Sequence, residues 1–177
     1  SRLRLPLWDY CKHRFVQSTN PPIDALRESH VMSRKVYLGT AAVNSPLLDA
    51  GQLRLLQKEL GATERILFTF PAEDGVEAAK ATLARMQETI KAASAHPPGM
   101  ILLTDRGVGT RQVALPALLA LAAAWKAMVE AGLQETPLVI ESGQVIDTHH
   151  VALLVAAGAS AVFPYLALEQ AAHLKPG

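Results

Sequence analysis

The sequence predicts an α/β fold in which about four parallel strands alternate with helices, preceded by an N-terminal helical segment. Three observations lead to this prediction. Four short apolar runs without polar alternation follow residue 62, as expected for strands that are covered on both faces. Helical patterns separate these runs, and a helix between two strands implies a right-handed crossover to a parallel neighbour. The length of 177 residues suits a single domain.

The first predicted helix begins at a proline pair. Asn20 precedes Pro21 and Pro22, and a residue before proline is held in an extended conformation that suits a helix cap. Proline itself fits the first helical turn. A helix is therefore predicted over residues 22–37, with Gly39 as its C-terminal stop.

A second helix is predicted after Asp49. Asp49 and Gln52 have the spacing of a capping box, in which two side chains satisfy free backbone N–H groups reciprocally. Gly61 ends the helix. Its apolar face consists of Leu53, Leu56 and Leu60. Residues 1–61 are thus interpreted as a mostly helical segment of the domain.

Residues 62–177 are predicted to form four βα units that complete this single domain. The strands are expected over residues 66–70, 100–104, 137–140 and 161–163. The helices that follow them are expected over residues 76–90, 115–131, 148–157 and 166–174, the first with a capping box of Asp74 and Glu77. Four βα units make half of an eight-stranded, TIM-type barrel, or an open parallel sheet. The sequence alone leaves both arrangements open.

Composition excludes several classes of protein. Lys and Arg total 17 against 16 Asp and Glu, so the net charge is +1 and no basic stripe points to nucleic acid. One cysteine, Cys11, allows neither an internal disulfide nor an iron–sulfur cluster, and burial is expected for it. A reducing, cytoplasmic location is the simplest interpretation. The uncharged runs 113–125 and 151–168 are too short or too interrupted to span a membrane.

The loops at the carboxyl ends of the predicted strands contain candidate functional residues. Sites of parallel α/β proteins lie at these ends, so Asp105, Arg106 and Glu141 are expected to converge. One interpretation is that they pair with one another and hold the loops together. The alternative is that they form, with His149, the site of an independent homodimeric βα enzyme.

Two adjacent histidines, His149 and His150, lie near a predicted helix start. Helical ligands of one metal ion are normally three or four residues apart, so no metal site is expected here. Neighbouring side chains on a helix point in different directions. One histidine is therefore predicted to pack inward and the other to cap the helix or face a partner.

The order of motifs along the chain resembles the central domain of the glutamate synthase family. Residues 15–24, FVQSTNPPID, are similar to the family string F-x-Q-x-T-N-P-P-I-D. Further similar segments follow in the family's order at residues 27–28, 31–33, 37–39, 101–108, 116–120, 141–143, 149–154 and 158–166. The resemblance extends over about residues 10–169.

The resemblance implies a non-catalytic domain that connects a glutamine amidotransferase domain to an FMN-binding synthase domain. In that family, ammonia released from glutamine travels through an internal tunnel to 2-oxoglutarate, and glutamate is formed. Thr19, Asn20, Pro21 and Pro22 are implied to lie near the interdomain region that includes the tunnel. The catalytic cysteine, the FMN site and the iron–sulfur cluster are implied to belong to other domains, so no cofactor is assigned to this chain.

Two further expectations concern partners. The charged fraction of 19% is below the roughly 25% of ordinary soluble domains, which suggests that part of the surface is normally covered. An isolated copy is therefore expected to self-associate, or to bind the flanking domains. A third hypothesis is a structural or regulatory partner of an amidotransferase made on a separate chain.

Overall fold

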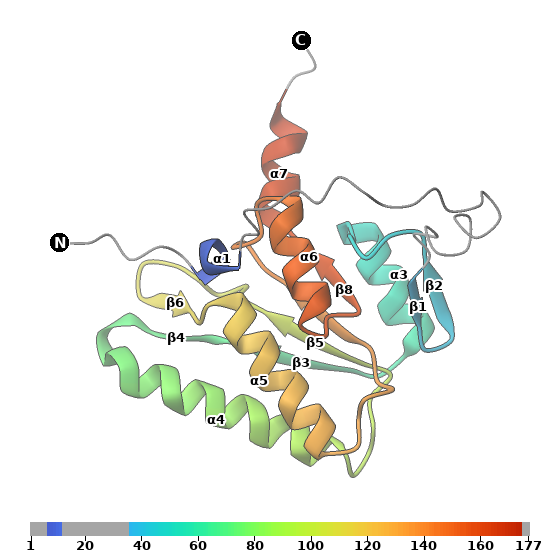
Figure 1. Ribbon diagram of the computed structural model, residues 1–177, viewed down its shortest axis with the longest axis horizontal. Coiled ribbons are helices and arrows are strands. Elements are labelled where there is room, and N and C mark those ends of the chain that lie inside the picture. Colours follow the sequence, from blue (N-terminus) through green and yellow to red (C-terminus); the bar gives the residue numbers. More distant parts are fainter. Residues whose placement is uncertain (1–6, 12–35, 175–177) are drawn as a thin grey trace, which may run out of the picture.

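A four-stranded parallel sheet forms the centre of the protein. The computed structural model describes residues 7–11 and 36–174 (Figure 1). The sheet has the order β3-β5-β7-β8, formed by Thr63–Leu67, Met100–Thr104, Leu138–Glu141 and Ala161–Phe163. The helices that follow these strands are α4 (Gly75–Ala93), α5 (Ala117–Glu130), α6 (Thr148–Ala156) and α7 (Tyr165–His173). The predicted parallel α/β fold is confirmed.

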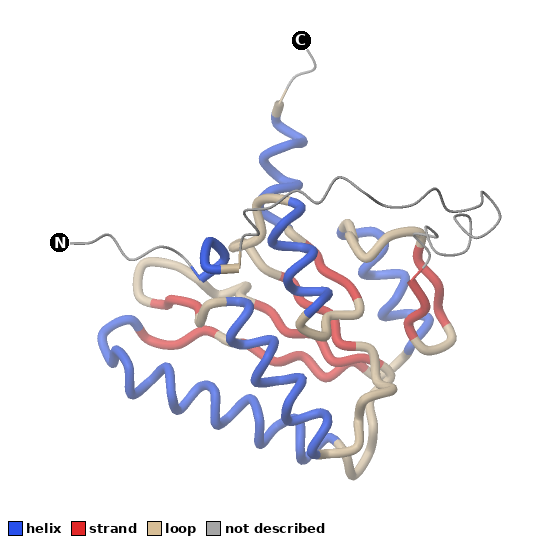
Figure 2. The backbone as a smooth tube through the Cα atoms, in the orientation of Figure 1, coloured by secondary structure: helices blue, strands red, loops and turns tan. Residues whose placement is uncertain are grey.

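The arrangement is that of a half-barrel-like βα unit. The strands lie in the sheet in the same order as in the chain, whereas a doubly wound open sheet reverses its order at a switch point. Helices α4, α5 and α6 pack on one face of the sheet (Figure 2). In a barrel this helix-covered face is the outside. We call it the outer face and the opposite one the inner face.

The alternation of side chains along each strand produces two separate cores. Leu103 of β5 packs into the outer core with Leu121 of α5, and both are fully buried. The adjacent Leu102 points to the inner core, where it meets Leu53 and Leu56 of helix α3 (Ala50–Leu60). Two clusters therefore share one sheet, and each depends on a different set of covering elements.

The inner face is covered by the segment before the sheet. Strands β1 (Val36–Leu38) and β2 (Ala41–Val43) form an antiparallel hairpin, and α3 spans Ala50–Leu60. The predicted capping box of α3 is confirmed, since Asp49 accepts a hydrogen bond from the Gln52 N–H and the Gln52 side chain accepts one from the Asp49 N–H.

The predicted helix over residues 22–37 is wrong at its end. Val36 and the residue after it belong to strand β1, and the rest of that prediction lies outside the described residues. Gly39 does not stop a helix. It has φ +57°, the left-handed conformation that glycine adopts readily, and makes the turn of the hairpin. Residues 36–43 form a β-hairpin, so the interpretation of residues 1–61 as mostly helical is wrong for this part.

The first apolar run is divided between two strands that belong to different sheets. The strand predicted over residues 66–70 is β3, which ends at Leu67, and then β4 (Thr69–Pro71). Strand β4 leaves the main sheet and pairs antiparallel with β6 (Gln112–Ala114). The predicted capping box at Asp74 is also wrong, because a 3₁₀ turn (η1, Ala72–Asp74) leads into α4 and the Asp74 side chain makes no cap.

A short helix, α1 (Leu7–Tyr10), lies against the outer core through the buried Trp8. Cys11 follows it and is exposed, contrary to the expected burial, because the chain leaves the helix in a turn there. Among the described residues, no helix combines the length and the apolar character that crossing a membrane requires.

Candidate functional site

The carboxyl ends of β5, β7 and β8 meet in a hydrogen-bonded network. The Glu141 carboxylate at the end of β7 lies at its centre, with a side chain only 8% exposed. Thr104 donates its hydroxyl to Glu141 Oε2 at 2.7 Å, and the Arg106 Nε–H donates to Oε1 at 2.9 Å. The Arg106 N–H in turn donates to the Thr104 hydroxyl oxygen at 3.1 Å. The two loops are thus tied at their first residues.

Asp105 ties the same two loops at a second point. The Ser142 hydroxyl donates to Asp105 Oδ2 at 2.7 Å, and the Gly143 N–H lies 3.0 and 3.1 Å from the two carboxylate oxygens. The side chain of Gln144 then extends the link to α5. It accepts a hydrogen bond from the Ala117 N–H and donates one to a backbone carbonyl just before that helix. The buried carboxylate organises the loop after β7 and does not face solvent.

Arg106 and Tyr165 stack on each other at the first turn of α7. The guanidinium carbon lies 3.8 Å from the centre of the Tyr165 ring, within the range of a cation–π contact. Burial by itself lowers the pKa of Arg106, but the hydrogen bond and charge of Glu141, together with the nearby Glu169 and Tyr165, outweigh this effect and the net shift is upward. Burial, followed by the nearby charge of Asp105, raises the pKa of Tyr165 to about 12. The tyrosine therefore keeps its proton well above neutral pH.

A polar cavity of about 230 Å³ lies beside this network, between α3 and the inner face of the sheet. We call it the arginine cavity. Its charged lining consists of Arg54 of α3, Arg65 of β3, Arg106 and Glu141. Arg65 reaches Glu141 only at 3.7 Å, which is an ion-pair distance but too long for a hydrogen bond. Leu53, Leu102 and Phe163 contribute apolar surface to it.

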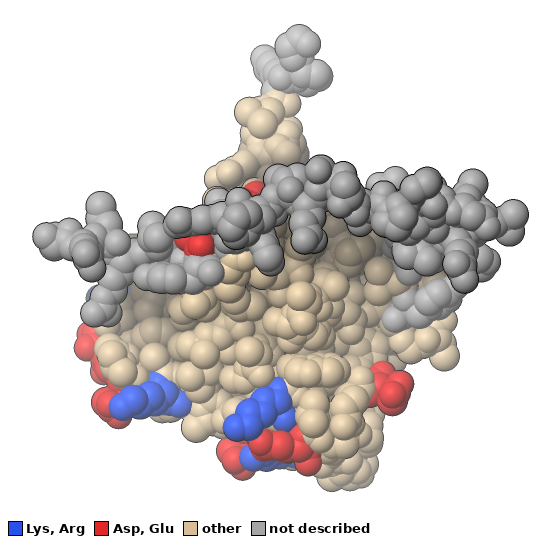
Figure 3. Space-filling view, viewed as in Figure 1, with Lys and Arg blue, Asp and Glu red and all other residues tan. Residues whose placement is uncertain are grey.

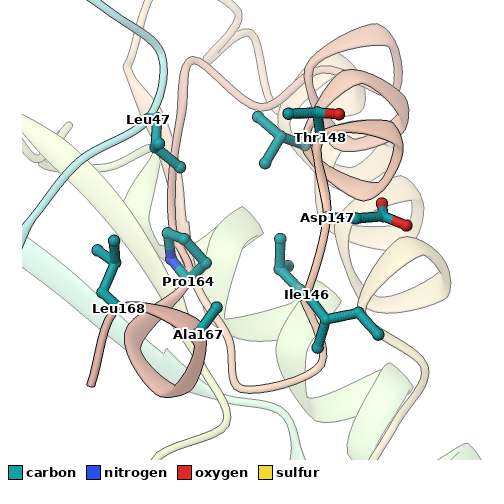
Figure 4. A pocket seen from close by; sticks show the side chains of 9 residues that line it. Leu47, Ile146, Asp147, Thr148, Pro164, Ala167 and Leu168 are labelled. Carbon is teal, nitrogen blue, oxygen red and sulfur yellow. The ribbon is translucent and has the colours of Figure 1, made fainter. Parts of the chain in front are cut away.

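A second, mainly apolar groove lies on the other side of β8. Figure 4 shows it between Leu47, the loop that leads into α6, and the first turns of α7. Its volume is about 180 Å³. We call it the α6–α7 groove. Ile146 on its rim is 70% exposed, which is a large free apolar surface for a single side chain.

The two histidines fasten α1 to α6. The ring of His150 is buried and stacks on Trp8 with 4.4 Å between ring centroids. His149 Nε2 lies 3.2 Å from the Trp8 carbonyl oxygen. The prediction that one histidine packs inward is confirmed. His149 takes part in this contact with α1 and not in the network around Glu141.

The structure therefore brings together Asp105, Arg106 and Glu141, but not as one charged triplet. Arg106 pairs with Glu141, while Asp105 binds the loop after β7. Thr19, Asn20, Pro21 and Pro22 lie outside the described residues, so their predicted role stays a prediction.

Sequence reasoning missed Thr104, Arg54 and Arg65. Arg65 gave little signal, because it follows Thr63 and Glu64 in the polar first part of β3, and the predicted strand began only at residue 66. Arg54 gave none, because it lies on the polar side of an ordinary amphipathic helix.

Comparison with known proteins gives one consistent result. A family model described as the glutamate synthase central domain matches residues 1–176. A ferredoxin-dependent glutamate synthase of Pyropia yezoensis is 34% identical over 184 residues, which cover 94% of this chain and 12% of that protein. The large chain of the NADPH glutamate synthase of Azospirillum brasilense is 33% identical over 183 residues, with the same coverage. The chain thus spans about an eighth of the length of these relatives.

Proposed function

The chain belongs to the glutamate synthase central domain family, and from this we propose that it connects and positions the glutamine amidotransferase and FMN-binding synthase domains of a glutamate synthase. The observation that carries the proposal is the match of residues 1–176 to the family. We further propose that the domain supports the path of ammonia between the two sites and contributes no catalytic group. The single cysteine also favours a reducing compartment such as the cytoplasm.

The surface supports a role between neighbouring domains. Helix α6 contains no Lys, Arg, Asp or Glu, and α5 contains only Lys126 and Glu130. Figure 3 shows the consequence: charged side chains gather along the rim near α4 and the end of α5, while the area over α5 and α6 is largely uncharged. Leu119 and Val129 of α5 and Val155 of α6 are exposed, and exposed apolar areas on a domain mark surfaces that pack on a partner.

The α6–α7 groove supports the same role. Its lining is mostly apolar, and Ile146 and Leu47 are exposed at its edge. The relatives are about eight times longer than the matched segment, so other parts of the same polypeptide exist there to cover it. We propose that an apolar segment of an adjoining domain of the same polypeptide occupies the groove.

The strand-end network supports a non-catalytic role. Both oxygens of Glu141 and both oxygens of Asp105 accept hydrogen bonds from within the domain. A general base must lie within reach of a substrate proton, and these carboxylates are almost fully buried, with Asp105 1% and Glu141 6% exposed. These carboxylates instead act as ties between loops. The alternative of an independent enzyme also required His149 at this site, and His149 contacts Trp8.

The coupling of the two half-reactions tests the proposal. In a full-length glutamate synthase that contains this domain, Ile146→Asp should lower the amount of glutamate formed per glutamine hydrolysed, because a charge in the groove disturbs domain positioning. Val76→Asp is the matched control, since Val76 is 69% exposed at the start of α4, near the charged rim. The same measurement on Asn20→Ala tests the tunnel role of residues 19–22. Unchanged coupling in both Ile146→Asp and Asn20→Ala would contradict the proposal.

A further inference from the structure

We propose that the arginine cavity is a binding site for a small oxyanion of the phosphate or dicarboxylate type. The inference rests on the cavity itself and is independent of the positioning role proposed above. Guanidinium groups present planar forks that match the oxygens of carboxylates and phosphates, and three such groups line this one space.

Among the described residues, the charged side chains that line the cavity do not balance one another. Arg54, Arg65 and Arg106 contribute three positive charges to the lining and Glu141 contributes one negative charge, which leaves two positive charges. Glu169 reaches Arg106 from outside the lining at 3.4 Å, and its side chain is 55% exposed. Counting Glu169 leaves one positive charge in excess, and the lining alone has two. A small oxyanion of one to two negative charges would neutralise this excess, and clustered like charges favour its entry.

All three arginine side chains of the cavity have N–H donors to spare. Arg106 uses Nε for Glu141 and one terminal nitrogen for Glu169. Arg65 makes only the 3.7 Å contact with Glu141, so its fork forms no hydrogen bond with that carboxylate. Arg54 has no ion pair or hydrogen-bonded side chain partner within residues 7–11 and 36–174. The amide of Gln57, one turn after Arg54 on α3, offers a neutral donor on the same wall.

The place in the fold also favours a ligand. The cavity is lined by residues at the carboxyl ends of β7 and β8, and in βα barrels ligands bind at that end. Its wall includes Ala50 in the first turn of α3, the end of the helix that carries partial positive charge. Leu53, Leu102 and Phe163 exclude water from part of the wall, which strengthens the electrostatic attraction inside. Charge, donors and position thus converge on one class of ligand.

Titration calorimetry on the chain tests the site, with inorganic phosphate in one arm and succinate in the other. Ionic strength is held constant with chloride. We expect saturable binding of at least one anion, weakened about tenfold or more in Arg54→Gln and in Arg65→Gln, since each loses a charge-assisted hydrogen bond. Arg111→Gln is the matched control, because it removes the same charge from an exposed residue outside the cavity, next to β6. Its affinity should stay within twofold.

The two arms separate the sources of the anion. Preference for phosphate assigns the site to phosphorylated ligands, preference for succinate assigns it to dicarboxylates, and equal affinity supports a general oxyanion site. Thermal unfolding of each variant verifies that it is folded. If Arg54→Gln does not fold, Arg65→Gln alone tests the site. The absence of saturable binding in both arms would overturn the proposal. An equal loss in Arg111→Gln would overturn it too, since binding would then depend on net charge and not on the cavity.

Discussion

The two faces of the sheet are built on different principles. The outer face is a continuous apolar core, in which side chains of α4, α5 and α6 interlock with alternate residues of all four strands. The inner face has a smaller core under α3 and the β1–β2 hairpin, and it becomes polar toward the carboxyl ends of the strands. The same strands supply both faces, because successive side chains point in opposite directions.

The difference shows how stability and recognition are divided within one half barrel. In a closed barrel the inner face is filled by layers of side chains from opposing strands. Here α3 takes the place of the missing strands and buries Leu53 and Leu56. Helix α3 and the β1–β2 hairpin do not fill the whole inner surface, and the arginine cavity lies between α3 and the strand ends. Packing is thus concentrated on one face and unbalanced charge on the other.

The largest expected effect compares adjacent leucines of β5 that point to opposite faces. Leu103→Ala should lower the free energy of unfolding by about 4 kcal/mol, because Leu103 is fully buried and the outer core is closed. Leu102→Ala should cost about 2 kcal/mol, since Leu102 borders the arginine cavity and water can occupy the enlarged space. Denaturant unfolding of both variants measures the difference.

The pair controls for strand position and for residue type. Equal losses in the two variants would show that the inner face is packed as tightly as the outer one. A larger loss for Leu102→Ala would reverse the comparison and make the inner core the main source of stability.

The next effect compares two carboxylates on the two faces. Glu141→Gln should cost about 2 kcal/mol, because the side chain is 8% exposed and its charge holds Arg106 and Arg65. Glu130 at the end of α5 pairs with Lys91 and Lys126 but is 45% exposed. Glu130→Gln should cost less than about 0.5 kcal/mol, as is usual for surface ion pairs. Denaturant midpoints of the two variants test this.

Salt sharpens the same comparison. The small contribution of Glu130 should disappear at high ionic strength, since solvent ions screen exposed charges. The contribution of Glu141 should largely persist. A loss for Glu141→Gln no larger than that for Glu130→Gln would contradict the view that the strand-end network is built on a buried charge.

Most of the βα unit was predictable from the sequence, because its periodicities are local. The strand at Met100–Thr104 is a run of five buried residues, and the apolar positions of α4 recur at helical spacing. The pairing of strand-end groups also followed, since parallel strands bring Asp105, Arg106 and Glu141 to one edge. These features depend on patterns within about twenty residues and on a general rule for parallel sheets.

The rest depended on contacts between distant segments. In the sequence, the end of β3 and the start of β4 look like one apolar run. Strand β4 leaves the main sheet only because it pairs with β6, more than forty residues later. The arginine cavity combines α3 with β3, and an arginine on a helix surface gives no sign of what it faces. Likewise, Gly39 suits a helix end as well as a hairpin turn, and the pairing of β1 with β2 decides between them.

The smallest effect concerns Tyr165, which links the inner core to the strand-end network. Burial and the nearby Asp105 carboxylate raise its pKa to about 12, against about 10 in an unfolded chain. Between these values the folded state retains a proton that the unfolded state has lost, so stability should fall as pH rises from about 10 to 12.

Absorbance titration of the phenolate, compared between wild type and Tyr165→Phe, should reveal one late-titrating tyrosine that the variant lacks. At neutral pH the variant should lose only about 1 kcal/mol, for the hydrogen bond with Asp105. A tyrosine that titrates near 10 in the folded protein would show that the strand-end network is open to solvent, and the contrast between its buried charges and those of the helical surface would then vanish.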